Sequence, residues 1–74
     1  MTGMREVRTS ATSQQPIRLG QFLKLADVVE LGSDVKLLLA EGSVEVNGAI
    51  ETRRGRQLTH GDIVTVRGEQ LVVH

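Results

Sequence analysis

The spacing of apolar residues changes at Gly42 from that of helices to that of strands, and this change most constrains the fold. Before Gly42, apolar residues recur at intervals of three and four in two stripes: Leu19, Phe22, Leu23 and Ala26, then Val35, Leu38 and Leu39. After Gly42, apolar and polar residues alternate. Intervals of three and four place side chains on one face of a helix, whereas alternation places them on one face of a strand. The sequence therefore predicts two helices followed by a sheet.

The second half of the chain reads as short strands separated by turns. Val44 and Val46 precede Asn47-Gly48, the strongest short signal for a hairpin, because a type I′ turn requires positive φ at both of its positions. Residues 63–66 and 71–73 are β-branched or aliphatic runs bounded by Gly-containing turns. We therefore predict the α+β class, with a helix pair packed on a small antiparallel sheet.

The residues that flank the apolar stripes predict where the helices begin and end. Gly20 is a weak N-cap for the first helix, and Ser33 is a stronger one for the second, with Asp34 in the first turn. Gly42 stands at the C′ position, where a left-handed residue commonly ends a helix. Leu25 and Leu37 lie off the stripes, which predicts that both helices are covered on more than one side.

The chain has 74 residues, which is enough for one small domain. Residues 1–15 form a distinct N-terminal segment, in which residues 5–9 can form a short edge strand and residues 9–15 are polar and expected to be flexible. Met4 can serve as an alternative start. Residues 16–74 form the predicted domain.

The sequence gives little support for catalysis or for metal binding. The chain has no cysteine, and its two histidines, His60 and His74, lack a second ligand at metal spacing. Glycine-rich phosphate-binding loops are absent, and the carboxylates are scattered rather than paired. We therefore expect no enzyme activity, catalytic residue, metal or cofactor. No membrane span or secretory signal is recognisable, which predicts a cytoplasmic protein.

The placement of charge is more informative than its sum, since basic and acidic residues number nine each. Residues 52–57 contain three arginines and no acid. A short run of this kind is most simply a solvated loop, but the planar guanidinium also matches phosphate. Arg18, Lys24 and Lys36 lie on or beside the predicted helices and can converge on this loop. Phe22 is needed in the core, so RNA, if bound, is contacted through its backbone and shape rather than by stacking.

Four segments together resemble the S4 RNA-binding domain, especially the small stand-alone bacterial S4-like proteins. They are Arg-Leu-Gly-Gln-Phe-Leu-Lys at 18–24, Gly-Ser-Asp-Val-Lys at 32–36, Glu-Gly-Ser-Val-Glu-Val-Asn-Gly at 41–48 and Gly-Asp-Ile-Val-Thr-Val at 61–66. The resemblance implies the S4-like (alpha-L) fold, a helix pair on a strongly bent antiparallel sheet. It also implies binding of structured RNA, often ribosomal or transfer RNA, through the helix pair and a basic loop.

Carried over position by position, the resemblance implies a set of RNA-binding residues on both helices and in the loop: Arg18, Lys24, Ser33, Lys36, Arg53, Arg54, Arg56 and Gln57. Two positions depart from many S4 domains, because Gly20 replaces an aspartate and Asp34 replaces a basic residue. Asp34 removes one expected phosphate contact. The leading hypothesis is a non-enzymatic module that docks structured RNA, such as ribosomal RNA or a ribosomal subunit, without a membrane or small-molecule substrate. The alternative is a protein-interaction module that uses the basic loop or an exposed sheet edge.

Overall fold

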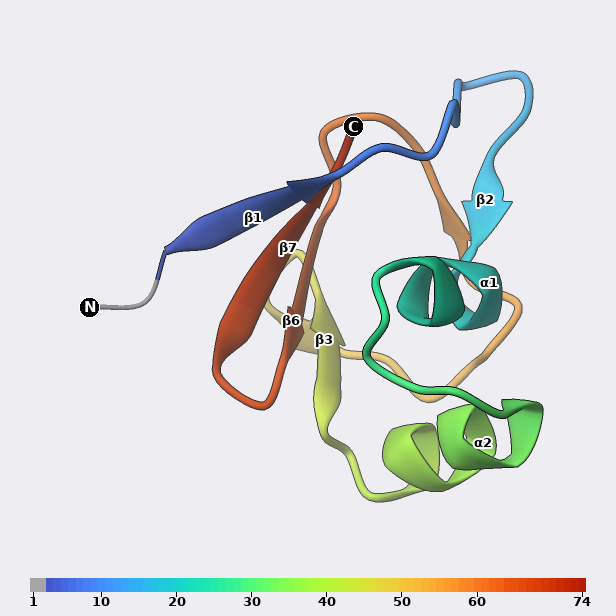
Figure 1. Cartoon of the computed structure of the whole chain (residues 1–74), viewed down its shortest axis with the longest axis vertical. Coiled ribbons are helices and arrows are strands. Elements are labelled where there is room, and N and C mark those ends of the chain that lie inside the picture. Colours follow the sequence, from blue (N-terminus) through green and yellow to red (C-terminus); the bar gives the residue numbers. More distant parts are fainter. Residues whose placement is uncertain (1–2) are drawn as a thin grey trace.

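The computed structural model describes residues 3–74 and has two helices beside a sheet (Figure 1). The helices are α1 (Leu19–Leu25) and α2 (Gly32–Ala40). The strands in this part of the chain are β1 (Met4–Val7), β2 (Ile17–Arg18), β3 (Val44–Val46), β4 (Ala49–Ile50), β5 (Gln57–Leu58), β6 (Ile63–Val66) and β7 (Glu69–Val73). The predicted α+β class is confirmed.

The main sheet has the strand order β1-β7-β6-β3-β4, and β2 pairs separately with β5. The prediction of a wholly antiparallel sheet needs one correction, because β1 runs parallel to β7 and the sheet is mixed. A parallel pair requires a long crossover between its strands. Here β1 and β7 lie near opposite ends of the described chain, so all the residues between these two strands form the crossover. The β2–β5 pair is not among the predicted strands, and its residue Gln57 ends the run at 52–57 that the sequence predicts to be a loop.

Two hairpins connect the antiparallel strands through two-residue turns. Asn47 and Gly48 have φ of 52° and 87°, and the register pairs Val46 with Ala49, as a type I′ turn requires. The predicted Asn-Gly hairpin is therefore confirmed. The turn between β6 and β7, at Arg67-Gly68, also has positive φ at both positions.

The core lies between the helices and one face of the sheet. It contains the apolar residues that recur at helical spacing in the helices and at alternate positions in the strands. Both predicted helical stripes are buried, as are alternate residues of the central strands: Val44, Val46, Val64, Val66, Leu71 and Val73. Val7 and Ala11, from the N-terminal segment, pack into the same cluster. The division of the chain at residues 15 and 16 stays a prediction.

The predicted N-caps are wrong for both helices. Arg18 is the N-cap of α1, and Leu31 is the N-cap of α2, so that Gly20 and Ser33 lie inside the first turns. In each case the side chain three positions after the N-cap satisfies the N-cap backbone. The carboxamide oxygen of Gln21 accepts from the N–H of Arg18 at 3.4 Å. The carboxylate of Asp34 accepts from the N–H of Leu31 at 3.3 Å.

The predicted end of the second helix is confirmed. Gly42 has φ of 72° and follows the C-cap residue Glu41. Its N–H donates to the carbonyl of Leu39, and the N–H of Ser43 donates to the carbonyl of Leu38. These two bonds form a Schellman motif, which turns the chain from α2 towards β3.

Leu25 and Leu37 are not covered, contrary to the sequence-based prediction. Their exposed fractions are 53% and 61%. Each helix buries one stripe, and a chain of this length has too little material to form a second layer over the outer faces.

Replacement of Gly48 by valine should lower the free energy of unfolding by about 1–2 kcal/mol, because a side chain with a Cβ is strained at φ of 87°. Nothing lies within 4 Å of the position that a Cβ would take, so the cost comes from the backbone and not from a clash. Gly55→Val is the matched control, since Gly55 is equally open and has no positive φ. Thermal melts that coincide for the two variants would contradict a type I′ turn.

Candidate nucleic-acid interface

The arginine loop, residues 51–56, is docked by its backbone on the first turn of α1. The carbonyl of Arg56 accepts from the N–H of Leu19 at 2.8 Å, and the carbonyl of Arg54 accepts from the N–H of Gly20 at 2.9 Å. The first N–H groups of a helix have no partner within the helix. Because the loop supplies those partners, its position relative to α1 is fixed by the fold.

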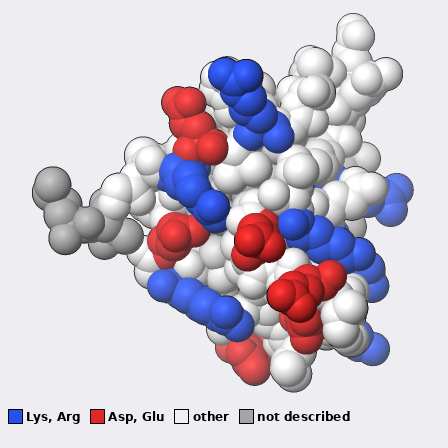
Figure 2. All heavy atoms as spheres, in the orientation of Figure 1, with Lys and Arg blue, Asp and Glu red and all other residues white. Residues whose placement is uncertain are grey.

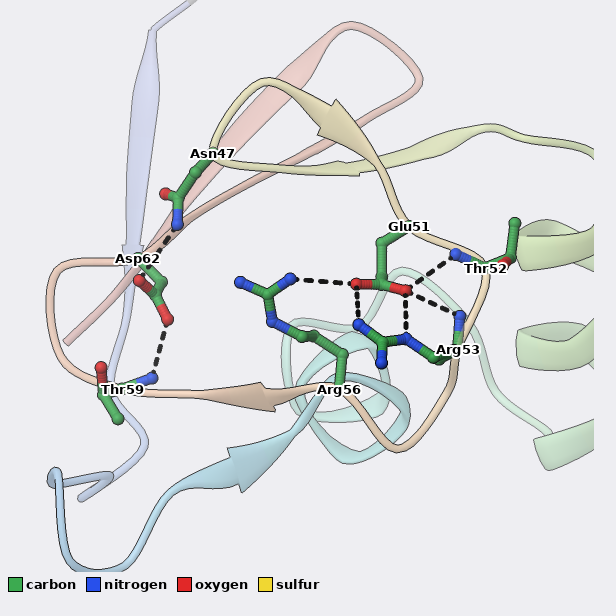
Figure 3. Close-up of polar contacts among 7 residues, drawn as sticks. All are labelled: Asn47, Glu51, Thr52, Arg53, Arg56, Thr59 and Asp62. Atoms are coloured by element: carbon green, nitrogen blue, oxygen red, sulfur yellow. Dashed lines mark hydrogen bonds and ion pairs between the residues drawn. The ribbon is translucent and has the colours of Figure 1, made fainter.

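A single buried carboxylate, Glu51, organises the arginine loop (Figure 3). One oxygen, Oε2, accepts from the backbone N–H groups of Thr52 and Arg53 and from Arg53 Nε, each at 3.1 Å. The other oxygen, Oε1, accepts from Arg56 Nη1 at 3.0 Å and from Arg53 Nη2 at 3.3 Å. Glu51 is 7% exposed, and its charge is balanced locally by two guanidinium groups.

These contacts stabilise the ionised form of Glu51. The side-chain and backbone hydrogen bonds from Arg53 lower the pKa of the Glu51 carboxyl to about 2 from an ordinary 4.5, with a further contribution from Arg56. Burial acts in the opposite direction but is outweighed. Glu51 precedes the run at residues 52–57 by one position and compensates two of its arginines, so the prediction of a run without a compensating acid is wrong.

The side chain of Arg54 reaches the first turn of α2. It makes no ion pair within residues 3–74. A methyl group placed on Gly32 would lie 3.7 Å from Lys24 Nζ and 3.9 Å from Arg54 Nη2. The tips of a lysine from α1 and an arginine from the loop therefore converge at the first turn of α2.

Arg18 joins these two cations in one hollow, which we call the cationic groove. It has a volume of about 360 Å³ and is lined by Arg18, Gly20, Gln21, Lys24, Arg54 and Gly55. Its three cations are exposed, and no carboxylate of the described chain forms an ion pair with them. The groove thus gathers positive charge from a helix and a loop that are about thirty residues apart in sequence.

The other predicted residues flank the cationic groove or face elsewhere. Gln57 lies opposite Arg18 in the β2–β5 register and lines a neighbouring hollow with Arg53, Gly55 and Arg56. Ser33 is exposed in the first turn of α2. Lys36 follows Gly32 by four residues, so it lies on the same side of α2 one turn further along. The structure thus brings Arg18, Lys24 and Arg54 together and pairs Arg53 and Arg56 with Glu51.

The surface as a whole does not carry one sign of charge. Figure 2 shows basic and acidic side chains interleaved on the face that contains the helices and the sheet edge. In physiological salt, the field of an exposed charge is screened beyond a Debye length of about 8–10 Å. At longer range the interleaved charges of opposite sign therefore have little net effect. Attraction for an anionic ligand must therefore act locally, where the cationic groove concentrates unpaired cations.

The described residues include no group of three histidine, cysteine or acidic side chains placed to hold a metal ion. Neither helix in residues 3–74 has the length and apolar character required to cross a bilayer.

A short helix pair on a small sheet, with a basic loop docked at the start of the first helix, defines an S4-type domain. The family model described as "S4 domain" matches residues 11–74, and the chain belongs to that family. The resemblance seen in the sequence is confirmed.

Two relatives are small proteins of similar length. The Bacillus subtilis (strain 168) protein named "Probable ribosome maturation protein RlbA" is 52% identical over 52 residues, which cover 70% of this chain and 73% of that protein. The Escherichia coli (strain K12) protein named "Putative RNA-binding protein YbcJ" is 37% identical over 57 residues, covering 77% and 81% respectively.

Proposed function

We propose that this protein is a non-enzymatic module that binds structured RNA, ribosomal RNA above all, through the cationic groove. The observation that carries the proposal is the convergence of Lys24 Nζ and Arg54 Nη2 on the first turn of α2. The names of the two relatives, which refer to ribosome maturation and to RNA binding, support the same class of ligand.

The chemistry of the groove suits a phosphate backbone. Lysine offers a compact charge and arginine a planar fork, and both bind phosphate oxygens. The start of α2 adds little to their attraction, because the Asp34 carboxylate already occupies its first turn. Phe22, the only Phe, Tyr or Trp residue, is fully buried, so bases cannot stack on it. Recognition therefore depends on the phosphates and on the shape of the folded RNA.

The arginines of the loop divide into two roles in this proposal. Arg54, which is unpaired, contacts RNA with Arg18 and Lys24, while Ser33, Lys36 and Gln57 extend the surface. Arg53 and Arg56 hold the loop in place through Glu51 and contribute less to RNA directly, because both guanidinium groups are engaged by the Glu51 carboxylate. This division accounts for three arginines in six residues without requiring a strongly basic protein.

The test compares single variants in binding to a fluorescently labelled, folded ribosomal RNA fragment. Arg54→Gln should weaken binding by about fivefold to tenfold, the equivalent of about 1–1.4 kcal/mol, and leave the melting temperature unchanged. Arg67→Gln is the matched control, since Arg67 is an exposed arginine on the β6–β7 turn that does not line the cationic groove. Equal affinities for wild type and Arg54→Gln would overturn the proposed site.

A further inference from the structure

A second group of basic side chains lies where residues 8–12, the β5–β6 turn and the end of β7 meet. Arg8, His60 and His74 line one hollow of about 460 Å³ together with Ser10, Ala11 and Thr12. The ring centroids of His60 and His74 are 5.2 Å apart, and the rings are tilted by 53°. We call this the histidine hollow, and it shares no lining residue with the cationic groove.

Backbone hydrogen bonds hold the three segments of the histidine hollow together. The N–H of Gly61 donates to the carbonyl of Val73 at 2.8 Å, which places His60 beside His74. The N–H of His74 donates to the carbonyl of Val7 at 2.9 Å, and the N–H of Thr9 donates to the carbonyl of His74 at 2.8 Å, which places Arg8 beside both. The meeting of these side chains is therefore a consequence of the sheet.

We propose that the histidine hollow binds a phosphate group. The guanidinium of Arg8 supplies a permanent charge, and the imidazoles of His60 and His74 supply N–H donors. The hydroxyl groups of Ser10 and Thr12 are additional donors on the same wall. A divalent metal fits less well, because Arg8 would repel it and the described chain offers no third ligand.

The charges around the histidine hollow favour an anion. Arg8 makes no ion pair within the described residues. No side-chain carboxylate lines the hollow, and the main-chain carboxyl oxygen of His74 accepts from the N–H of Thr9 at 2.8 Å and from its hydroxyl at 3.2 Å. Asp62, on the same turn as His60, already accepts from Asn47 Nδ2 at 3.2 Å and from the N–H of Thr59 at 2.9 Å (Figure 3).

The phosphate can be free in solution or part of an RNA backbone. Figure 1 shows His74, at the end marked C, on the side of the molecule away from α2. An RNA that occupied both sites would have to extend across the domain. The phosphate site itself does not depend on the proposed function, and only the assignment of its phosphate to RNA does.

The test is an NMR titration of the full chain with inorganic phosphate at pH 6 and constant ionic strength. Saturable shifts of the His60 and His74 ring signals are expected. Sulfate, an anion of similar shape, should produce saturable shifts of the same signals. Arg8→Gln and His60→Gln should each weaken binding by about fivefold, whereas Arg67→Gln should not. Shifts that never saturate, or that persist in both variants, would overturn the proposal.

A second arm identifies the source of the phosphate. If RNA supplies it, His60→Gln should weaken RNA binding. If RNA affinity is unchanged by this substitution while phosphate still saturates the hollow of the wild type, the ligand is free phosphate. If Lys24→Gln and Arg54→Gln have no effect on RNA while the hollow still binds phosphate, the proposed function fails and the histidine hollow stands.

Discussion

Phe22→Ala is expected to lower the free energy of unfolding by ~3–5 kcal/mol. The ring of Phe22 is fully buried on α1 between the helices and the sheet, and it is the largest side chain in the core. Small domains have a total stability of about 5–15 kcal/mol, so this single cavity removes a large share. Chemical denaturation, followed by circular dichroism, measures the effect directly.

Leu25→Ala is the matched control for Phe22→Ala, because Leu25 lies on the same helix but is 53% exposed. It should change the free energy of unfolding by less than about 0.5 kcal/mol. A melting temperature for Phe22→Ala within a degree or two of wild type would contradict the position of Phe22 in the core.

Glu51→Gln is expected to lower the free energy of unfolding by about 2–3 kcal/mol. The glutamine keeps the shape of the side chain but loses the charge, and its NH₂ group would face the guanidinium groups of Arg53 and Arg56. Glu51 accepts all of its hydrogen bonds from Thr52, Arg53 and Arg56, so the substitution also loosens the arginine loop. RNA affinity should then fall although the groove's own cations are intact.

Glu45→Gln is the control for Glu51→Gln, since Glu45 is a half-buried glutamate on β3 without an ion pair in the described part of the chain. A stability equal to wild type for Glu51→Gln would show that the carboxylate does not organise the loop.

The pH dependence of stability provides an independent check on Glu51. Because the pKa of Glu51 is lowered to about 2 in the folded protein, its contribution is complete above the ordinary pKa of 4.5. The contribution is lost as the pH falls from about 4.5 towards 2. Wild type should therefore lose more stability than Glu51→Gln over this interval. Parallel losses in the two proteins would contradict the assignment.

The features that the sequence predicts correctly are those that depend on local spacing. An Asn-Gly pair between two runs of alternating apolar and polar residues favours a turn with positive φ, whatever the rest of the fold. The apolar residues of α1, Phe22 among them, lie on one face of the helix, and this is the face that is buried. Gly42 ends α2 for a similarly local reason, because it adopts a left-handed conformation that other residues resist. These signals depend little on the rest of the fold.

The features that escape prediction depend on contacts between distant segments. The β2–β5 pair has two residues in each strand, too few for a pattern, and β1 pairs with β7 from the opposite end of the described chain. The helix starts were misplaced because Gln21 and Asp34 reach back to the preceding N–H groups. Likewise, the separation of Arg54 from Arg53 and Arg56 becomes visible only when Glu51 is seen to be buried.

The most direct measurement of the central claim is the salt dependence of RNA affinity for wild type and for the double variant Lys24→Gln/Arg54→Gln. Each phosphate contact contributes ~0.7 to 0.9 to the slope of log K against log salt concentration. Loss of two contacts should therefore reduce the slope by ~1.4 to 1.8 and weaken binding at low salt, while Arg67→Gln keeps the wild-type slope. A double variant with the slope and affinity of wild type would contradict the assignment of the cationic groove to RNA.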